Sequence, residues 1–320
     1  MSGKVDVSGG AGQGGTVIVT GDRIGILAGA NINASGGAGA GKVIIGGDNL
    51  HKVVDIMSVG MSAQTVVQAG SNINISSANG NGGFVETSGH VISIAGNING
   101  AAPKGTAGQW LIDPTELEVV SGAGDTAGAP GSSFMFQNSS GAPSSTVSNA
   151  SIVNALNGSS VLVTTNSSGG AAGNITVNAD LVKSCTSATT LTLLANNTIT
   201  INNSIGVSGS GQLAVNLTAQ GPGGIVINSA AGQAVTVAAN ISGGNALTIN
   251  ASNLTAAGDG VSCITGNSGS GIGINTLQQT LSINNQGNGS INISGSSNSS
   301  TGLVANSNLT ASNSGNGSIN

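Results

Sequence analysis

Short stretches in which apolar and polar residues alternate recur along the whole chain. Five of them are Thr16–Thr20, Lys42–Ile45, Asn72–Ser76, Thr198–Asn202 and Leu281–Asn285. Alternation with a period of two puts apolar side chains on one face of a β-strand, and the Gly, Asn and Ser residues between the stretches are turn formers. The pattern predicts many short strands joined by tight turns.

Longer repeats organise these strands. The blocks 8–22, 35–48 and 77–89 resemble one another, at offsets of 27 and then 42 residues, as if an extra excursion around residues 51–67 had been inserted. Residues 281–292 match residues 309–320 at an offset of 28. The last repeat shows no capping change, which is typical of a boundary within a longer protein.

Repeats of about 20 to 30 residues made of short strands favour a parallel β-helix over a β-sandwich. We therefore expect an all-β, right-handed parallel β-helix (a solenoid) of about 12 to 15 coils, each about 4.8 Å from the next. The handedness follows from the strong preference of parallel crossovers. Inward Val, Ile, Leu and Ala would form the core, while corner Asn residues would form amide ladders between coils.

Residues 101–160 interrupt the repeat. Gly108–Pro114 is interpreted as a strand ended by proline, residues 122–145 as an irregular loop, and Ser148–Gly158 as a short capped helix. The expected organisation is thus β-helix coils over 1–114, an irregular loop and short helix over 115–160, and Asn/Ser/Thr-rich coils over 161–320 that are truncated at the C-terminus.

Composition narrows the possible functions. The 320 residues include 55 Gly, four aromatic residues and no Tyr, and only 5% are charged, so no ordinary aromatic core can form. Many β-branched residues and a net charge of only −5 argue against disorder. The six basic residues are scattered, which predicts no nucleic-acid partner. No apolar run reaches 18 residues, so no transmembrane segment is expected.

An ordered series of motifs resembles a known family. The series covers residues 82 to about 205 and consists of GGFVETSG (82–89), VISI (91–94), GQWLIDP (108–114), IVNALNG (152–158), NITVN (174–178) and TLTLLANNTITIN (190–202). Together these resemble the shaft of filamentous-haemagglutinin and high-molecular-weight-adhesin exoproteins of two-partner secretion. The amino-terminal secretion domain of that family is not recognised in these residues.

The resemblance implies a β-helical protein that is secreted through an outer-membrane β-barrel transporter and is exposed at the cell surface or released. It implies adhesion to a host-cell or bacterial surface ligand, with glycans among the candidates. A stalk that carries a contact-dependent toxin domain would share this shaft and is the alternative function.

A carbohydrate-active β-helix enzyme is the less favoured alternative, since such enzymes place two or three carboxylates on adjacent coils. The candidate acids are Asp22, Asp48, Asp55, Glu86, Asp113, Glu116 and Glu118. Asp22 and Asp48 end equivalent strands, but both follow Gly at a corner where Asp is a good turn residue. Asp113, before Pro114, is interpreted as a strand terminator. We therefore predict no enzyme activity and no catalytic residue.

Other candidate residues are also interpreted as structural. Trp110 is expected to plug the end of a coil rather than to stack on a sugar. His51 and His90 are isolated and lack a nucleophile signature, so neither a metal nor a cofactor site is predicted. Cys185 and Cys263 match no metal-ligand spacing, although a disulfide between them stays open.

Two further sequence motifs bear on ligand binding and modification. The Gly-rich runs 9–15 and 36–41 lack the Asp of calcium-binding nonapeptide repeats and the GK[ST] of phosphate loops. Asn-x-Ser/Thr triplets are frequent in a chain this rich in Asn, Ser and Thr, and glycosylation is left open; the triplets include those at Asn33, Asn74, Asn157, Asn174, Asn216, Asn240, Asn250 and Asn308.

Overall fold

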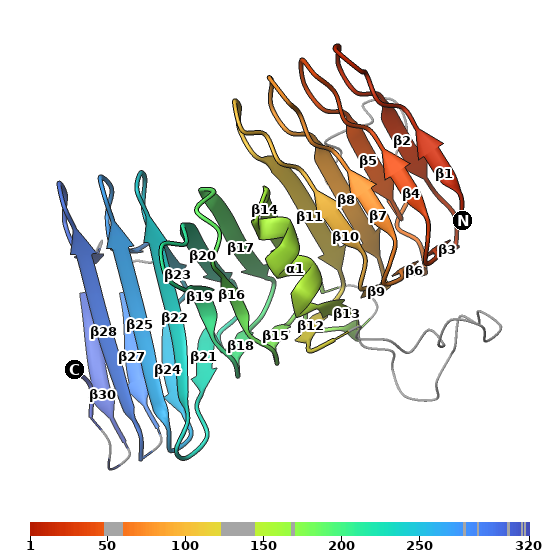
Figure 1. The fold of residues 1–320 in the computed structure, drawn as a ribbon. Coiled ribbons are helices and arrows are strands. Elements are labelled where there is room, and N and C mark those ends of the chain that lie inside the picture. The colour runs from red at the N-terminus through yellow and green to blue at the C-terminus, as the bar shows by residue number, and fades with distance from the viewer. Residues whose placement is uncertain are drawn as a thin grey trace. The chain divides into compact units, whose positions relative to one another are not determined.

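The protein is a parallel β-solenoid of about nine turns, shown in Figure 1. The computed structural model describes residues 1–47, 60–122, 145–167, 170–277, 280–286, 288–305, 308–314, 316 and 318–320. Contacts divide the chain into two compact units, Met1–Ala171 and Ala172–Asn320. The predicted all-β solenoid is confirmed, and the described residues contain one short helix.

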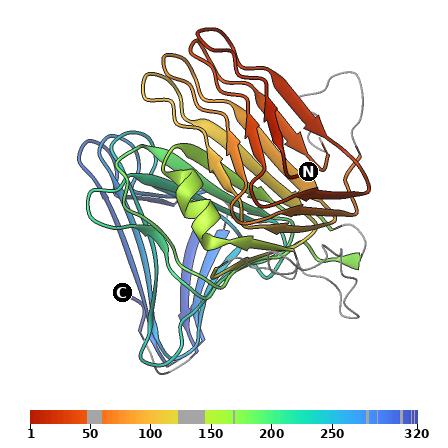
Figure 2. The same ribbon diagram turned by 45° about the vertical axis from the view of Figure 1, so that its right-hand side comes forward.

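In the first unit successive coils contribute strands to three parallel sheets, whose strands lie side by side in Figures 1 and 2. The first sheet contains β1 (Lys4–Asp6), β4 (Asn31–Asn33), β7 (Asn72–Asn74) and β10 (Asn97–Asn99). The second contains β2 (Thr16–Val19), β5 (Lys42–Ile45), β8 (Phe84–Gly89), β11 (Gly108–Pro114) and β14 (Ser159–Thr164). The third contains β3 (Arg23–Ile26), β6 (Gln64–Val67), β9 (Val91–Ile94), β13 (Thr146–Ser148) and β12 (Leu117–Val120).

Equivalent side chains stack from coil to coil because the strands pair in register. Ile32 pairs with Ile73, which pairs with Ile98, and all three are buried. Removing such a column from water is the main stabilising term of a narrow core. The same register holds β2, β5 and β8 together, with Thr16, Lys42 and Phe84 at equivalent positions. The equivalence of the three repeat blocks is therefore confirmed.

The predicted amide ladder follows the first sheet. Asn74 Nδ2 donates to Asn33 Oδ1 at 3.2 Å, and Asn99 Nδ2 donates to Asn74 Oδ1 at 3.3 Å. The ladder continues to Asp6, whose Oδ1 accepts from Asn33 Nδ2 at 3.2 Å. Along the ladder the sequence separation is 27, 41 and then 25 residues. Coil length therefore varies in the turns while the strands keep their register.

Where the repeat was predicted to break, the strand order changes and a helix appears. β13 pairs with both β9 and β12, although β12 precedes it in the chain. The helix α1 (Asn149–Leu156) follows β13 and packs on β10 and β14. It lies next to β10, as shown by the hydrogen bond that Asn154 Nδ2 donates to Asn97 Oδ1 at 3.4 Å. A helix thus ends the first sheet.

The predicted helix is confirmed, but its predicted capping is not. Ser148 is the N-cap residue in an extended conformation, yet its side chain makes no capping hydrogen bond. At the other end the Gly158 N–H donates to Ala155 O at 3.0 Å. Buried Ile152, Ala155 and Leu156 hold the helix, so packing stabilises it rather than its caps. Most of the predicted irregular loop lies outside the described residues.

The second unit repeats the plan of three stacks of parallel strands, and pairing between β22 and β20 joins the first two stacks into one sheet. One stack contains β16 (Leu181–Lys183), β19 (Ile205–Val207), β22 (Ala234–Ile241), β25 (Val261–Ser268) and β28 (Ser290–Ser297). The next contains β17 (Thr189–Ala195), β20 (Leu213–Ala219), β23 (Leu247–Asn250), β26 (Ile274–Thr276) and β29 (Leu303–Ala305). The third contains β15 (Ile175–Val177), β18 (Ile199–Ile201), β21 (Ile225–Asn228), β24 (Asn253–Ala257), β27 (Thr280–Asn285) and β30 (Asn308–Asn313).

Neutral polar side chains occupy outward positions of this unit. Thr176 pairs with Thr200 and Thr200 with Val226, all of them partly exposed, beside a buried column that includes Ile175, Ile199 and Ile225. Adjacent coils are 24 residues apart at Asn178 and Asn202 and 28 apart at Ser282 and Thr310. The predicted match of residues 281–292 with 309–320 is confirmed, since Leu281 pairs with Leu309.

The predicted number of coils was wrong. About 12 to 15 were expected, and the solenoid has about nine. Residues that pair between adjacent coils are 24 to 32 positions apart in the second unit, and 51 positions apart between β11 and β14 in the first. The chain therefore forms fewer coils than the shortest repeats in the sequence suggest. The handedness expected from parallel crossovers stays a prediction.

Removing one complete coil should leave the fold intact. Deletion of residues 199–224 removes β18, β19 and β20, one strand from each stack, and brings β21 to the place on β15 that β18 held. We expect the variant to keep a β-sheet circular dichroism spectrum and a cooperative urea transition, because nearest-neighbour interfaces carry solenoid stability.

The control is a deletion of residues 199–211, which removes β18 and β19 but leaves β20, so the following strands no longer fall on their own sheets. This variant should lose the cooperative transition. Equal stability of the two deletions would contradict the in-register description.

Candidate functional site

Asp22 and Asp113, two of the acids that a carbohydrate-active enzyme could use, lie on different coils that are not adjacent. Asp22 is exposed, with its Oδ2 3.8 Å from Arg23 Nε. Asp113 ends β11, and the pairings of β2, β5, β8 and β11 put it three strand spacings, about 14 Å, from the coil of Asp22. Asp48 and Asp55 lie outside the described residues. Asp22 and Asp113 therefore form no carboxylate pair.

A buried polar cluster lies on β8 and β11. Ser88 pairs with Asp113, and Ser88 Oγ donates to Glu86 Oε1 at 2.7 Å. Glu86 is 0% exposed and Asp113 2% exposed. Side chains two positions apart in a strand point to the same face, so Glu86, Ser88 and Asp113 share one side of the sheet. Their burial keeps them from any ligand in solution in this structure.

Trp110 is part of the core. Its side chain is 0% exposed, and Nε1 donates to Thr87 Oγ1 of the preceding coil at 3.0 Å. It lies in the middle of β11, paired with Val85 and Val161, rather than at the end of a coil. Stacking of Trp110 on a sugar is excluded by this burial.

The remaining predicted candidates are dispersed. His90 is exposed, and His51 lies outside the described residues. The described residues contain no group of three His, Cys, Asp or Glu side chains that could hold a metal ion. Cys185 and Cys263 are free thiols.

Lys183 is a buried cation at the corner after β16. Its Nζ donates to Ser187 O and to Thr189 Oγ1, both at 2.7 Å. Burial lowers the pKa of Lys183 to about 8, against a smaller opposing effect of Cys185. The pKa of the Cys185 thiol is itself lowered, mainly because Ser187 hydrogen-bonds to the sulfur. The sequence patterns did not indicate that the pKa values of Lys183 and Cys185 would be lowered.

A groove lies on the flank of the first unit. The groove has a volume of about 370 Å³ and crosses three successive coils, where β5, β8 and β11 begin. Its lining residues are Ala40, Gly41, Lys42, Asn81, Gly82, Gly83, Phe84, Thr106, Ala107 and Gln109. We call it the flank groove. Sequence reasoning missed it, although the repeat blocks place a glycine directly before Lys42 and before Phe84.

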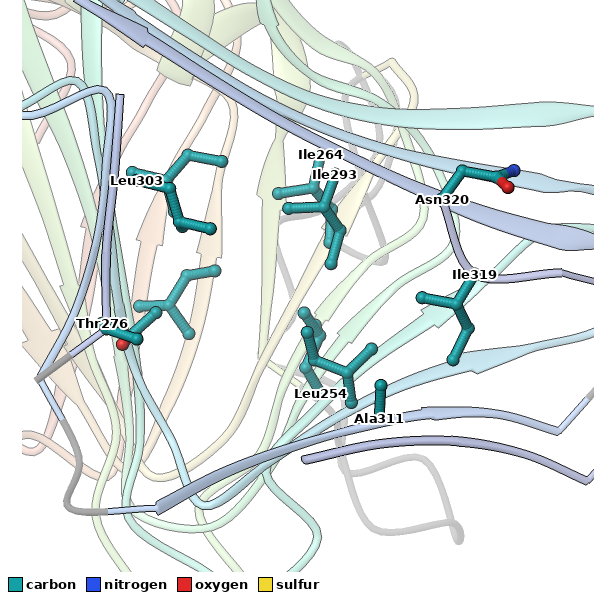
Figure 3. A pocket seen from close by; sticks show the side chains of 12 residues that line it. Leu254, Ile264, Thr276, Ile293, Leu303, Ala311, Ile319 and Asn320 are labelled. Atoms are coloured by element: carbon teal, nitrogen blue, oxygen red, sulfur yellow. The ribbon is translucent and has the colours of Figure 1, made fainter. Parts of the chain in front are cut away.

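A second hollow lies inside the last coils of the second unit. It measures about 260 Å³ and is lined almost wholly by apolar side chains. Figure 3 shows Leu254, Ile264, Ile293, Leu303 and Ile319 pointing into it from different strands. We call it the end opening, because it is the solenoid core itself where no described strand pairs beyond β28, β29 and β30.

Comparisons with models of known protein families and with curated proteins found no match to this chain. The fold therefore defines its class, a parallel β-solenoid. Among the described helical residues none form a helix with the length and hydropathy of a membrane span.

The stability of the chain should rise with pH where Lys183 titrates. Between pH 8 and 10.5 the unfolded chain binds a proton at Lys183 that the folded chain releases, so raising the pH favours folding. Relative to Lys183→Met, the wild-type free energy of unfolding should increase by up to about 1.4 kcal/mol per pH unit in this window. Urea titrations at several pH values measure it.

The matched control is Lys42→Met, which removes an exposed lysine. The difference in free energy of unfolding between Lys42→Met and wild type should stay constant over the same pH window. If the difference for Lys183→Met is constant as well, the Lys183 ammonium is exposed to solvent in the folded chain.

A polypeptide of residues 1–320 should self-associate through the end opening, because an uncovered core end with strand edges favours stacking. Leu303 is 42% exposed and lines the opening, whereas Leu277 is 48% exposed and does not line it. In sedimentation experiments Leu303→Lys should weaken association at least about fivefold, since it puts a charge into an apolar contact. Leu277→Lys should change it little; equal effects would locate association elsewhere.

Proposed function

We propose that the chain is a segment of the shaft of a secreted bacterial surface adhesin of the filamentous-haemagglutinin type. The main support is that the motifs of the series resembling that family fold as strands and a helix of the solenoid. VISI is β9, GQWLIDP is β11, and IVNALNG contains the end of α1. TLTLLANNTITIN spans most of β17 and all of β18.

The inferred role is mechanical. Within each unit backbone hydrogen bonds join the described strands of neighbouring coils, and outward Asn and Thr side chains add neutral contacts. Neutral ladders avoid the repulsion of stacked like charges and are insensitive to salt. A shaft of this kind would hold a binding region away from the cell surface and contribute its flanks to attachment or aggregation. In this proposal the chain catalyses no reaction.

The proposed route to the surface is export through an outer-membrane β-barrel transporter. A solenoid suits such a route, because each coil contacts only its neighbours and folding can propagate as the chain emerges. The final location in this proposal is the cell surface or the medium, where the shaft would meet a ligand on host or bacterial cells.

Surface display tests the proposal. Antibodies raised against folded residues 1–320 should label intact cells of the source bacterium, and protease added outside should remove the label. Deleting the transporter gene should abolish the label and reduce attachment to host cells or to neighbouring bacteria.

A periplasmic marker that stays protected in the same cells is the control for lysis. Labelling that appears only after permeabilisation would contradict display. Unchanged attachment after loss of the label would contradict an adhesive role.

A further inference from the structure

The flank groove is produced by glycines at the corner. A Cβ atom at Gly41 would overlap with the Gly15 carbonyl oxygen, and one at Gly83 would overlap with that of Gly41. These positions must lack side chains for the coils to stack at their normal spacing. The same lack of side chains leaves the corner hollow beside the first residues of β5 and β8.

Three different side chains stand in a row along this hollow. Lys42 pairs with Phe84, and Phe84 pairs with Gln109, so they follow one another at intervals of about 4.8 Å. Lys42 is exposed and the other two are partly exposed, whereas the next residues inward along the strands, Val43 and Val85, are buried. The row therefore presents a cation, an aromatic ring and an amide to solvent.

Two polar lining residues of the groove, Asn81 and Thr106, are held in place by hydrogen bonds. Asn81 Oδ1 accepts a hydrogen bond from the Thr106 N–H at 2.9 Å, and the Ala40 N–H donates to Asn81 O at 3.0 Å. These bonds join three successive coils across the groove. A wall built in this way is largely formed before any ligand arrives, which lowers the cost of binding.

The chemistry of the lining favours one class of ligand. Lys42 is the one ionisable side chain among the lining residues, so a divalent cation would find no carboxylate. A nucleic acid would need a cluster of basic residues. A carbohydrate offers an apolar face to an aromatic ring and hydroxyl groups to amides and a threonine. A carboxylate on it would pair with Lys42.

We propose that the flank groove binds an acidic saccharide. In this arrangement Phe84 contacts the apolar face of a sugar ring, Lys42 pairs with its carboxylate, and Gln109 hydrogen-bonds to hydroxyl groups. The inference deepens the proposed function and rests on it, because it gives the shaft a lateral binding site and names the class of its ligand.

Binding to residues 1–320 can be measured by NMR titration or calorimetry with two acidic probes, 3′-sialyllactose and tri-galacturonate. Their neutral counterparts are lactose and α-1,4-galactotriose. We expect at least one acidic probe to bind with a Kd of about 1 mM or tighter, and its neutral counterpart to bind at least about fivefold more weakly.

Three variants locate the site. Phe84→Leu keeps the apolar volume but removes the aromatic ring, and it should weaken binding of the acidic probe and of its neutral counterpart to the same extent. Lys42→Gln should weaken binding of the acidic probe about fivefold and leave binding of the neutral one unchanged. Arg23→Gln removes the same charge from β3, outside the lining, and should have no effect.

Circular dichroism of each variant establishes that it is folded. No saturable binding of either acidic probe by the folded chain, or equal losses for Lys42→Gln and Arg23→Gln, would overturn the inference. Such a failure is distinct from failure of the proposed function, since surface labelling and attachment do not depend on these probes.

Discussion

The in-register parallel pairing of successive coils is the constraint on which the rest of the structure depends. Each strand must meet the same strand of the next coil, so an inward isoleucine meets an isoleucine, as Ile32, Ile73 and Ile98 do. A slip of one residue would turn the apolar set outward. Differences in coil length are therefore confined to the turns, where separations of 25 to 41 residues leave the Asn33, Asn74 and Asn99 ladder unbroken.

The same constraint decides where chemistry can lie. In the paired strands that the structure describes, equivalent side chains stack from coil to coil, which favours apolar residues inward and neutral polar residues outward. Departures from the repeat sit at corners and at coil starts. Lys183 is buried at one corner with its pKa lowered to about 8, and the flank groove opens where glycines precede Lys42 and Phe84. In this molecule the residues that differ from coil to coil lie mainly in the turns, while the strands form the scaffold.

Several features were within reach of sequence reasoning because they are local. The strand predicted at residues 91–94 and the proline-ended strand predicted at 108–114 are β9 and β11 with these bounds, and the apolar spacing after Ser148 predicts α1. The Asn ladder follows once like residues are assumed to stack. What could not be foreseen was which side chains other segments cover: Glu86 and Asp113 look like accessible acids in the sequence but are buried. The partly exposed aromatic in a groove is Phe84, whereas the more conspicuous Trp110 is in the core.

By itself the sequence determined the class of fold. Short alternating strands separated by glycine and asparagine turns can bury their apolar faces only by stacking against further coils of the same kind. Only the tertiary structure decided the number of coils, the insertion of β13 between β9 and β12, and the meeting of Lys42, Phe84 and Gln109. The physical reason is that strand periodicity is a property of adjacent residues. Partners in a solenoid are instead separated by a coil length that the turns are free to change.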